Sequence, residues 1–472
     1  LSVSLTADTG LSPRITLCIA GMAETVSVDG RAMPLAGSAG QGLARMSKGR
    51  MEANTESYAR VERNGFRLVR NEPLSTFSAD VDTASYANVR RFLNEGRLPP
   101  EDAVRVEELI NYFRFDYGAP RPGDAVGLTT EVSACPWEPK HKLVLLGLNT
   151  TAIPQTDLPA RNFVFLLDVS GSMQSADKLP LIPLAMRMFL VTLRPADRVA
   201  IVVYAGASGL ALPSTPALQR GRIHGAIEML EAGGSTNGAA GIRLAYQIAR
   251  EQFVAGGVNR VILATDGDFN VGTTSHGELM ALIEAQRESG VFLSVLGVGT
   301  GNIKDSTMEM LADKGNGNYS YLDSLHEARK VLVSEAGATL QTVAKDVKIQ
   351  VEFNPAEVAA YRLVGYENRL LENEDFNDDT KDAGEMGAGH TVTALYEIVP
   401  KGVEPPVPSG DGPAVNRLVY QTDRLDTPRA TRGELLTFSV RYKEPDGRKS
   451  RLLSTAAGSN GADARHLPFA SA

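Results

Sequence analysis

Residues 162–172 read NFVFLLDVSGS, an apolar segment that ends at Asp168 and continues into a turn with two serines. Comparable apolar runs recur along the chain and alternate with segments whose apolar residues have helical spacing; these runs lie at 198–206, 260–267 and 291–299. Strands that are apolar on both faces and alternate with helices are typical of a parallel sheet covered on both sides. The pattern predicts a doubly wound α/β domain over residues 159–338.

Polar residues follow two of these runs at the point where each strand should end. Asp168 ends the first run and Asp266 ends the third, so both carboxylates should lie at the carboxyl edge of the sheet. Ser170 and Ser172 follow Asp168 in one turn, and a later GGST motif supplies Thr236. Hard divalent ions accept carboxylate and hydroxyl oxygens as ligands. The five residues therefore predict a metal site for Mg²⁺, with Mn²⁺ or Ca²⁺ as alternatives.

Neutral hydroxyls make up much of this predicted site. Ser170, Ser172 and Thr236 are the predicted direct ligands, and Asp168 and Asp266 would bind directly or through water. Such a site leaves the cation under-neutralised, so it should attract an Asp or Glu carboxylate from a protein partner. The alternative is that Asp168 and the serines only cap the following helix, but the GGST and ATDG motifs in matching places favour the metal.

Composition restricts the remaining function classes. The net charge of −8 and the lack of a basic run argue against a nucleic-acid partner. The sequence has no apolar stretch of the roughly 18 to 20 residues that a membrane span needs. It also has no Walker A loop, HExxH or GxSxG motif, so neither nucleotide binding nor hydrolysis is predicted. We expect a protein that is not an enzyme.

The flanks of the α/β domain differ from it in pattern. We expect a flexible lead-in over 1–72, a helical segment over 73–120, strands over 121–158 and a β-rich domain over 339–472. Because strands occur on both sides of the α/β domain, we predict that it is inserted into a β-sandwich built from both flanks. Pairing of 128–149 with the C-terminal strands would confirm this.

Three other motifs offer competing sites. Asp80 and Asp82 resemble the paired aspartates of haloacid-dehalogenase phosphatases, but Ala84 replaces the expected Thr or Val and residues 75–79 are not predicted to be a buried strand. A helix N-cap role for Asp82 or Thr83 is favoured instead.

The remaining two motifs are loops. The glycine-rich residues 297–302 end in Asn302 where a dinucleotide fingerprint needs glycine, so a turn is favoured. The acidic segment 372–385 begins like a calcium loop, but it lacks the required glycine and terminal Glu, so a solvated loop is favoured. The two cysteines leave open a Cys18–Cys135 bridge or, as the favoured alternative, two free thiols.

The DVSGSM, GGSTN and ATDGDFN motifs, in this order, resemble the von Willebrand factor type A domain and its metal-ion-dependent adhesion site (MIDAS). That resemblance implies a Rossmann-like fold and protein binding. The flanks resemble a bacterial subfamily with an N-terminal extension and a C-terminal domain of unknown function, in which the sequence runs on beyond the equivalent of residues 466–472. We therefore expect a truncated C-terminal domain.

The resemblance also implies an expected function and location. We expect an adhesion-type module in the periplasm or at the cell surface. The alternative is a structural or assembly component of a bacterial envelope complex, in which the metal only stabilises the fold.

Overall fold

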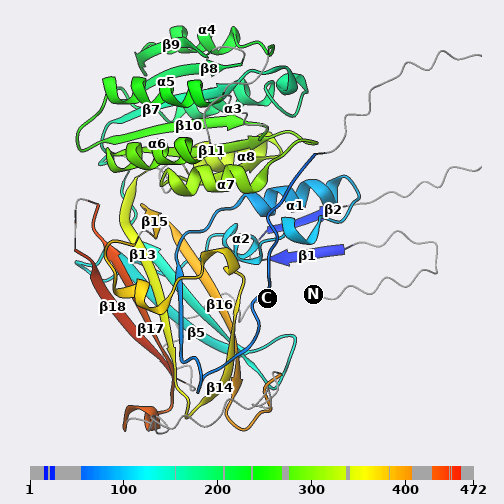
Figure 1. Ribbon diagram of the computed structural model, residues 1–472, viewed down its shortest axis with the longest axis vertical. Coiled ribbons are helices and arrows are strands. Elements are labelled where there is room, and N and C mark those ends of the chain that lie inside the picture. Colours follow the sequence, from blue (N-terminus) through cyan, green and yellow to red (C-terminus); the bar gives the residue numbers. More distant parts are fainter. Residues whose placement is uncertain are drawn as a thin grey trace, which may run out of the picture.

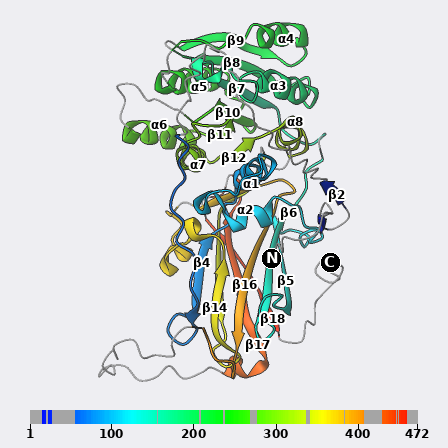
Figure 2. The ribbon, with the colours of Figure 1, turned by 90° about the vertical axis from the view of Figure 1, so that its right-hand side faces the viewer.

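A computed structural model describes most of the chain. It covers residues 55–154, 156–205, 208–234, 238–267, 276–335, 341–381, 383–406, 428–445, 447 and 449–458, together with the paired strands β1 (Ile15–Ile19) and β2 (Met22–Val26). An α/β domain, called the head, lies above a two-sheet β-sandwich, called the base, and short helices lie between them (Figures 1 and 2). In the part of the chain described here, no helix combines the length and apolar character needed to cross a membrane.

The sheet of the head has six strands in the order β12-β11-β10-β7-β8-β9. Their bounds are β7 (Arg161–Asp168), β8 (Arg198–Tyr204), β9 (Ser208–Pro216), β10 (Val258–Thr265), β11 (Val291–Val298) and β12 (Tyr319–Leu322). All neighbours are parallel except β9, which runs antiparallel to β8 at one edge. Every residue of β7 is buried, as expected for a strand covered on both faces. The predicted doubly wound domain is confirmed.

Helices cover both faces of this sheet. One face carries α3 (Leu181–Val191), α4 (Arg220–Glu228), α8 (Leu325–Arg329) and the π-helical turn η3 (Lys330–Ser334). The other carries α5 (Gly238–Glu251), α6 (His276–Glu288) and α7 (Asp305–Lys314). Because strand side chains alternate, Phe163 and Phe165 of β7 enter the first core while Val164 and Leu166 enter the second.

The base consists of two five-stranded sheets packed around a shared apolar core. The first has the order β3-β14-β16-β6-β5, with β3 (Arg67–Leu68), β14 (Val358–Val364), β16 (Thr391–Pro400), β6 (Lys142–Thr150) and β5 (Val126–Ala134). The second contains β15 (Gly384–Gly387), β13 (Thr342–Phe353), β17 (Glu434–Lys443) and β18 (Arg451–Gly458), with β4 (Leu74–Ser78) paired to β13. Since β6 precedes the head and pairs with β16 after it, the predicted insertion of the head into the sandwich is confirmed.

The N-terminal segment differs from expectation. Residues 55–72, predicted as flexible, are attached to both domains: the Thr55 amide donates to the Gly301 carbonyl at 2.7 Å, and β3 pairs with β14. Residues 75–79, predicted not to form a buried strand, lie almost wholly in β4 and are buried. Both predictions were wrong because these short segments gain their stability from long-range strand pairing, which leaves little local pattern.

Short helical elements complete the structure. They are α1 (Ala84–Asn94), η1 (Glu101–Ala103), α2 (Val106–Asn111), η2 (Gly171–Gln174), η4 (Glu367–Arg369), η5 (Asn373–Asn377) and η6 (Pro428–Arg432). Helix α1 packs against the head through Ala84 and Ala87, which join its second core. The helical segment is therefore part of the contact between head and base.

Buried ion pairs connect the same parts. Two arginines and six carboxylates make up what we call the joint cluster: Arg105, Arg369, Asp80, Asp82, Glu108, Asp305, Glu309 and Asp313. Arg369 lies 2.9 Å from Asp80, 3.0 Å from Glu309 and 2.6 Å from Asp313. Helix α7 of the head is thereby held by guanidinium groups from outside the head.

Candidate metal centre

The turn after β7 is fixed by backbone contacts to a neighbouring loop. The Gly171 amide donates to the Gly234 carbonyl at 3.0 Å, and the Gly233 amide donates to the Val169 carbonyl at 2.7 Å. The loop that leads to Thr236 therefore lies beside the serine turn. Thr236 itself is outside the described residues.

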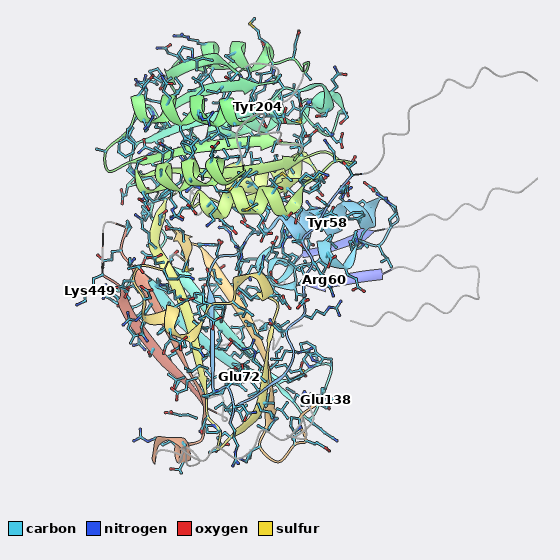
Figure 3. All side chains as sticks on the ribbon, viewed as in Figure 1. Tyr58, Arg60, Glu72, Glu138, Tyr204 and Lys449 are labelled. Atoms are coloured by element: carbon cyan, nitrogen blue, oxygen red, sulfur yellow. The ribbon has the colours of Figure 1, made fainter. Side chains whose placement is uncertain are left out.

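Asp168 is fully buried at the end of β7. One carboxylate oxygen accepts a hydrogen bond from the Ser170 amide at 2.9 Å, and the other accepts from the Tyr204 hydroxyl at 3.2 Å and the Thr265 hydroxyl at 3.1 Å. Burial raises the pKa of Asp168, and the negative charge of Asp266 adds to that rise, while the Ser170 hydrogen bonds oppose it. Figure 3 labels Tyr204 within the head.

Asp266 is also fully buried, directly after β10. Burial acts to raise its pKa, but hydrogen bonds from Asn302 and Ser172 and the ammonium of Lys178 outweigh burial and lower the pKa. The Lys178 ammonium lies 3.0 Å from a carboxylate oxygen of Asp266. The carboxylate is thus held in its charged form.

Four of the five predicted residues come together in the structure. The Ser170 and Ser172 hydroxyls lie 3.0 Å apart, Ser170 contacts Asp168, and Ser172 contacts Asp266. We call Asp168, Ser170, Ser172 and Asp266 the carboxylate–hydroxyl cluster. The cluster spans the turns after β7 and β10, which are neighbouring parallel strands.

The donors of this cluster fit a hard divalent ion. All four side chains offer oxygen, and the two carboxylates supply the negative charge that such an ion requires. The Lys178 ammonium at Asp266 shows independently that this carboxylate attracts a cation. Among the described residues, no group of three or more His, Cys, Asp and Glu is placed to hold a metal, so the hydroxyls are needed to complete any site here.

Four residues that contact the cluster were not predicted from the sequence. Tyr204 and Thr265 donate to Asp168, and Lys178 and Asn302 contact Asp266. Tyr204 ends β8 and Thr265 ends β10, so a search of all strand ends would have found them. Lys178 lies in an irregular segment before α3 and has no comparable signal in the sequence.

The competing aspartates have a different environment. Asp82 accepts a hydrogen bond from the Tyr319 amide at 2.7 Å and pairs with Arg369 at 3.3 Å. Thr83 is the N-cap residue of α1, but it makes no side-chain capping hydrogen bond. The predicted N-cap position at Thr83 is confirmed, but its side chain does not cap the helix, and a capping role for Asp82 was wrong because Asp82 pairs with Arg369.

The other predicted features can also be placed. Residues 299–302 form a bend after β11, and the side-chain oxygen of Asn302 accepts a hydrogen bond from the Lys178 ammonium at 2.8 Å. Asp375 accepts a hydrogen bond from the Glu372 amide within η5. Cys135 is a buried free thiol, so it does not form the bridge considered as an alternative, and the side chain of Cys18 is outside the described residues.

Comparisons with known proteins agree with this arrangement. Family profiles match three parts of the chain: "von Willebrand factor" at residues 52–145, "von Willebrand factor type A domain" at 163–268 and "Uncharacterized protein YfbK, C-terminal" at 338–472. The sequence is 45% identical over 412 residues to the uncharacterized protein YfbK of Escherichia coli (strain K12), an alignment that covers 86% of this chain and 70% of YfbK.

Solved structures are also similar. A von Willebrand factor type A protein from Catenulispora acidiphila has a TM-score of 0.40 and 14% identity, with 86% of this chain and 76% of that chain covered. The conserved hypothetical protein BatB from Bacteroides thetaiotaomicron has a TM-score of 0.33 and 20% identity, with 37% of this chain and 97% of that chain covered.

Proposed function

Because the chain belongs to the family of von Willebrand factor type A domain proteins that includes YfbK, we propose that it is a non-enzymatic module that binds a protein partner through a divalent cation. Domains of this type mediate protein interactions. The finer proposal is that the partner offers an Asp or Glu carboxylate, which is captured at the carboxylate–hydroxyl cluster.

One observation carries this proposal: two buried carboxylates and two serine hydroxyls converge at the carboxyl edge of the head sheet. Asp168, Ser170, Ser172 and Asp266 would hold the ion, and a bound divalent ion supplies positive charge for a partner's carboxylate. Tyr204 and Thr265 orient the Asp168 carboxylate, and Ser172 is exposed, so the cluster can be reached from solvent. Orientation of buried ligands by neighbouring hydrogen bonds favours a preformed site.

A pull-down from the native cell tests the proposal. The full chain should retain a partner in Mg²⁺ and lose it in EDTA, and Ser172→Ala should lose it even in Mg²⁺. Asp177→Asn is a matched control, because Asp177 is an exposed carboxylate on the same segment that is not part of the cluster. Equal retention of the partner in Mg²⁺ and EDTA would contradict the proposal.

A second function is favoured by the extensive contact between head and base. The joint cluster and α1 attach the head firmly, as expected of a structural or assembly component of a bacterial envelope complex whose metal only stabilises the fold. In that case the partner stays bound in EDTA, while the melting temperature falls when the ion is removed. For either function we propose a periplasmic or cell-surface location, which fractionation of the native cell would test.

A further inference from the structure

Lys178 brings a positive charge into the carboxylate–hydroxyl cluster. Its ammonium donates to Asp266 at 3.0 Å and to the side-chain carbonyl of Asn302 at 2.8 Å. The residue is only 7% exposed. A lysine loses hydration when it is buried, so a buried ammonium is retained only where charged or polar partners compensate.

The loop after β11 packs closely against the side chain of Lys178. Gly299 has a φ of +76°, and a Cβ at this position would lie 2.2 Å from Cγ of Lys178. A side chain at residue 299 would therefore displace the lysine stem. The close fit between the glycine and the stem, together with the two polar contacts, places the ammonium at the Asp266 carboxylate rather than in solvent.

We propose that Lys178 is a tethered cation that sets the net charge of the metal site: it weakens binding of the divalent ion and strengthens binding of a carboxylate to the ion-loaded site. This role rests on the proposed function and deepens it. In this role Lys178 determines how strongly the ion-loaded site binds a carboxylate.

The charges of the cluster give Lys178 this role. Among the described residues, Asp168 and Asp266 contribute two negative charges and Lys178 one positive charge, so these three groups together carry a net charge of −1. A divalent ion changes this to +1, which one partner carboxylate neutralises. Without the ammonium the same site carries −2, and the ion alone brings it to zero. The lysine therefore opposes the ion and favours the carboxylate, because its ammonium repels a cation and attracts an anion, and these interactions are stronger next to buried groups than in bulk water.

Binding of Mn²⁺ to the full chain, followed by electron paramagnetic resonance of the free ion, tests this role. Lys178→Met keeps most of the apolar stem and removes the charge, so it should bind Mn²⁺ on the order of tenfold more tightly than the wild type. Acetate should tighten Mn²⁺ binding in the wild type and do so roughly several-fold less in Lys178→Met. Lys178→Gln, which keeps a hydrogen-bond donor, is a second variant in case the first does not fold.

Lys304→Met is the matched control, because Lys304 lies on the same loop as Asn302 and its ammonium contacts the Thr55 carbonyl instead of Asp266. Lys304→Met should leave the Mn²⁺ affinity and its increase in acetate close to the wild-type values. A role in which Lys178 only orients Asp266 predicts weaker Mn²⁺ binding in Lys178→Met and nearly unchanged binding in Lys178→Gln, which keeps a hydrogen-bond donor. Weaker or unchanged Mn²⁺ binding would therefore overturn the proposed role while leaving the metal site intact. Failure of the wild type to bind Mn²⁺ would overturn the proposed function and this role together.

Discussion

At the scale of single residues, Asp168 has two distinct roles. It is a predicted metal ligand, and it is also the buried acceptor for the hydroxyls of Tyr204 and Thr265. Ser172 is exposed, and its hydroxyl lies 3.0 Å from that of Ser170. Substitutions at either position should therefore weaken cation binding, but only a substitution of Asp168 should clearly lower the stability of the fold.

This difference gives the first prediction. Asp168→Ala should lower the free energy of unfolding by about 1–3 kcal/mol, because it leaves two buried hydroxyls without their acceptor. Ser172→Ala should change it by less than about 0.5 kcal/mol, as is usual for an exposed position. Urea unfolding in EDTA measures both, with Asp177→Asn as the control. Equal stability of the two cluster variants would show that the hydrogen bonds to Asp168 do not support the fold.

The residues of the cluster and its contacts differ in how well they can be predicted from the sequence. Asp168 and Asp266 could be predicted because apolar strands end at them, and the serines because they share one turn with Asp168. Lys178 could not be predicted, since its position depends on the path of an irregular segment and on the space left by Gly299. Irregular backbone has no period from which side-chain direction can be inferred.

At the scale of elements, α7 and η4 are held together by Arg369. This guanidinium contacts two carboxylates of α7, Glu309 and Asp313, and also Asp80 and Asp82 after β4. The arginine is 9% exposed, and its partners Asp82 and Glu309 are buried as well, whereas Asp80 and Asp313 are partly exposed to solvent. Loss of one partner from a buried network of this kind leaves uncompensated charge.

The second prediction concerns this contact. Arg369→Met should lower the free energy of unfolding by about 3–5 kcal/mol, because two buried carboxylates, Asp82 and Glu309, lose a counter-charge. Arg67→Met is the control: Arg67 pairs with Glu72 on the surface, and its loss should cost less than about 1 kcal/mol. Chemical denaturation at neutral pH measures both. A cost for Arg369→Met as small as that of the control would mean that the network adds little to stability.

Elements of the head were easier to predict than those of the base. The strands β7, β8, β10 and β11 are long apolar runs, and their pattern is sufficient to indicate a parallel sheet. In contrast, β3 has two residues and β4 has five, and each depends on a partner strand far away in the sequence. Such pairing cannot be inferred from local propensity.

At the scale of the whole molecule, the joint cluster between head and base has six carboxylates for two arginines, and Glu107 of α2 is a further buried carboxylate. Burial raises the pKa of Glu107 to about 7, that of Glu309 to about 7 and that of Asp313 to about 6. In each case the folded chain binds a proton more tightly than the unfolded chain, whose carboxyl pKa values are about 4. The folded state therefore holds more protons between about pH 4 and pH 7.

The third prediction follows from the sign of this difference. The free energy of unfolding should fall as pH rises from about 5 to about 8, because the folded chain must release protons from groups that prefer to keep them. Denaturation at several pH values in constant salt measures the slope. Asp266, whose pKa is lowered, contributes only near or below its unfolded value of about 4. Burial lowers the pKa of His390 to about 4, so this one group opposes the trend below about pH 6.5, against the three carboxyl groups that produce it.

Glu107→Gln isolates one contribution to the slope. The amide does not titrate, so this variant should be more stable than the wild type at pH 8, by roughly 1–2 kcal/mol, and should show a shallower pH slope. Glu228→Gln, at an exposed position of α4, should leave the slope unchanged. Stability that rises from pH 5 to pH 8 in the wild type would contradict the assigned direction.

The proposed function and the proposed role of Lys178 both require that the carboxylate–hydroxyl cluster binds a divalent cation. Titration of the full chain with Mn²⁺, with direct measurement of bound ion, tests this claim. We predict one site that is lost in Asp168→Asn, which keeps the shape of the side chain, and retained in Asp177→Asn. A wild-type chain that binds no Mn²⁺, or an Asp168→Asn variant that binds it as tightly as the wild type, would contradict the claim.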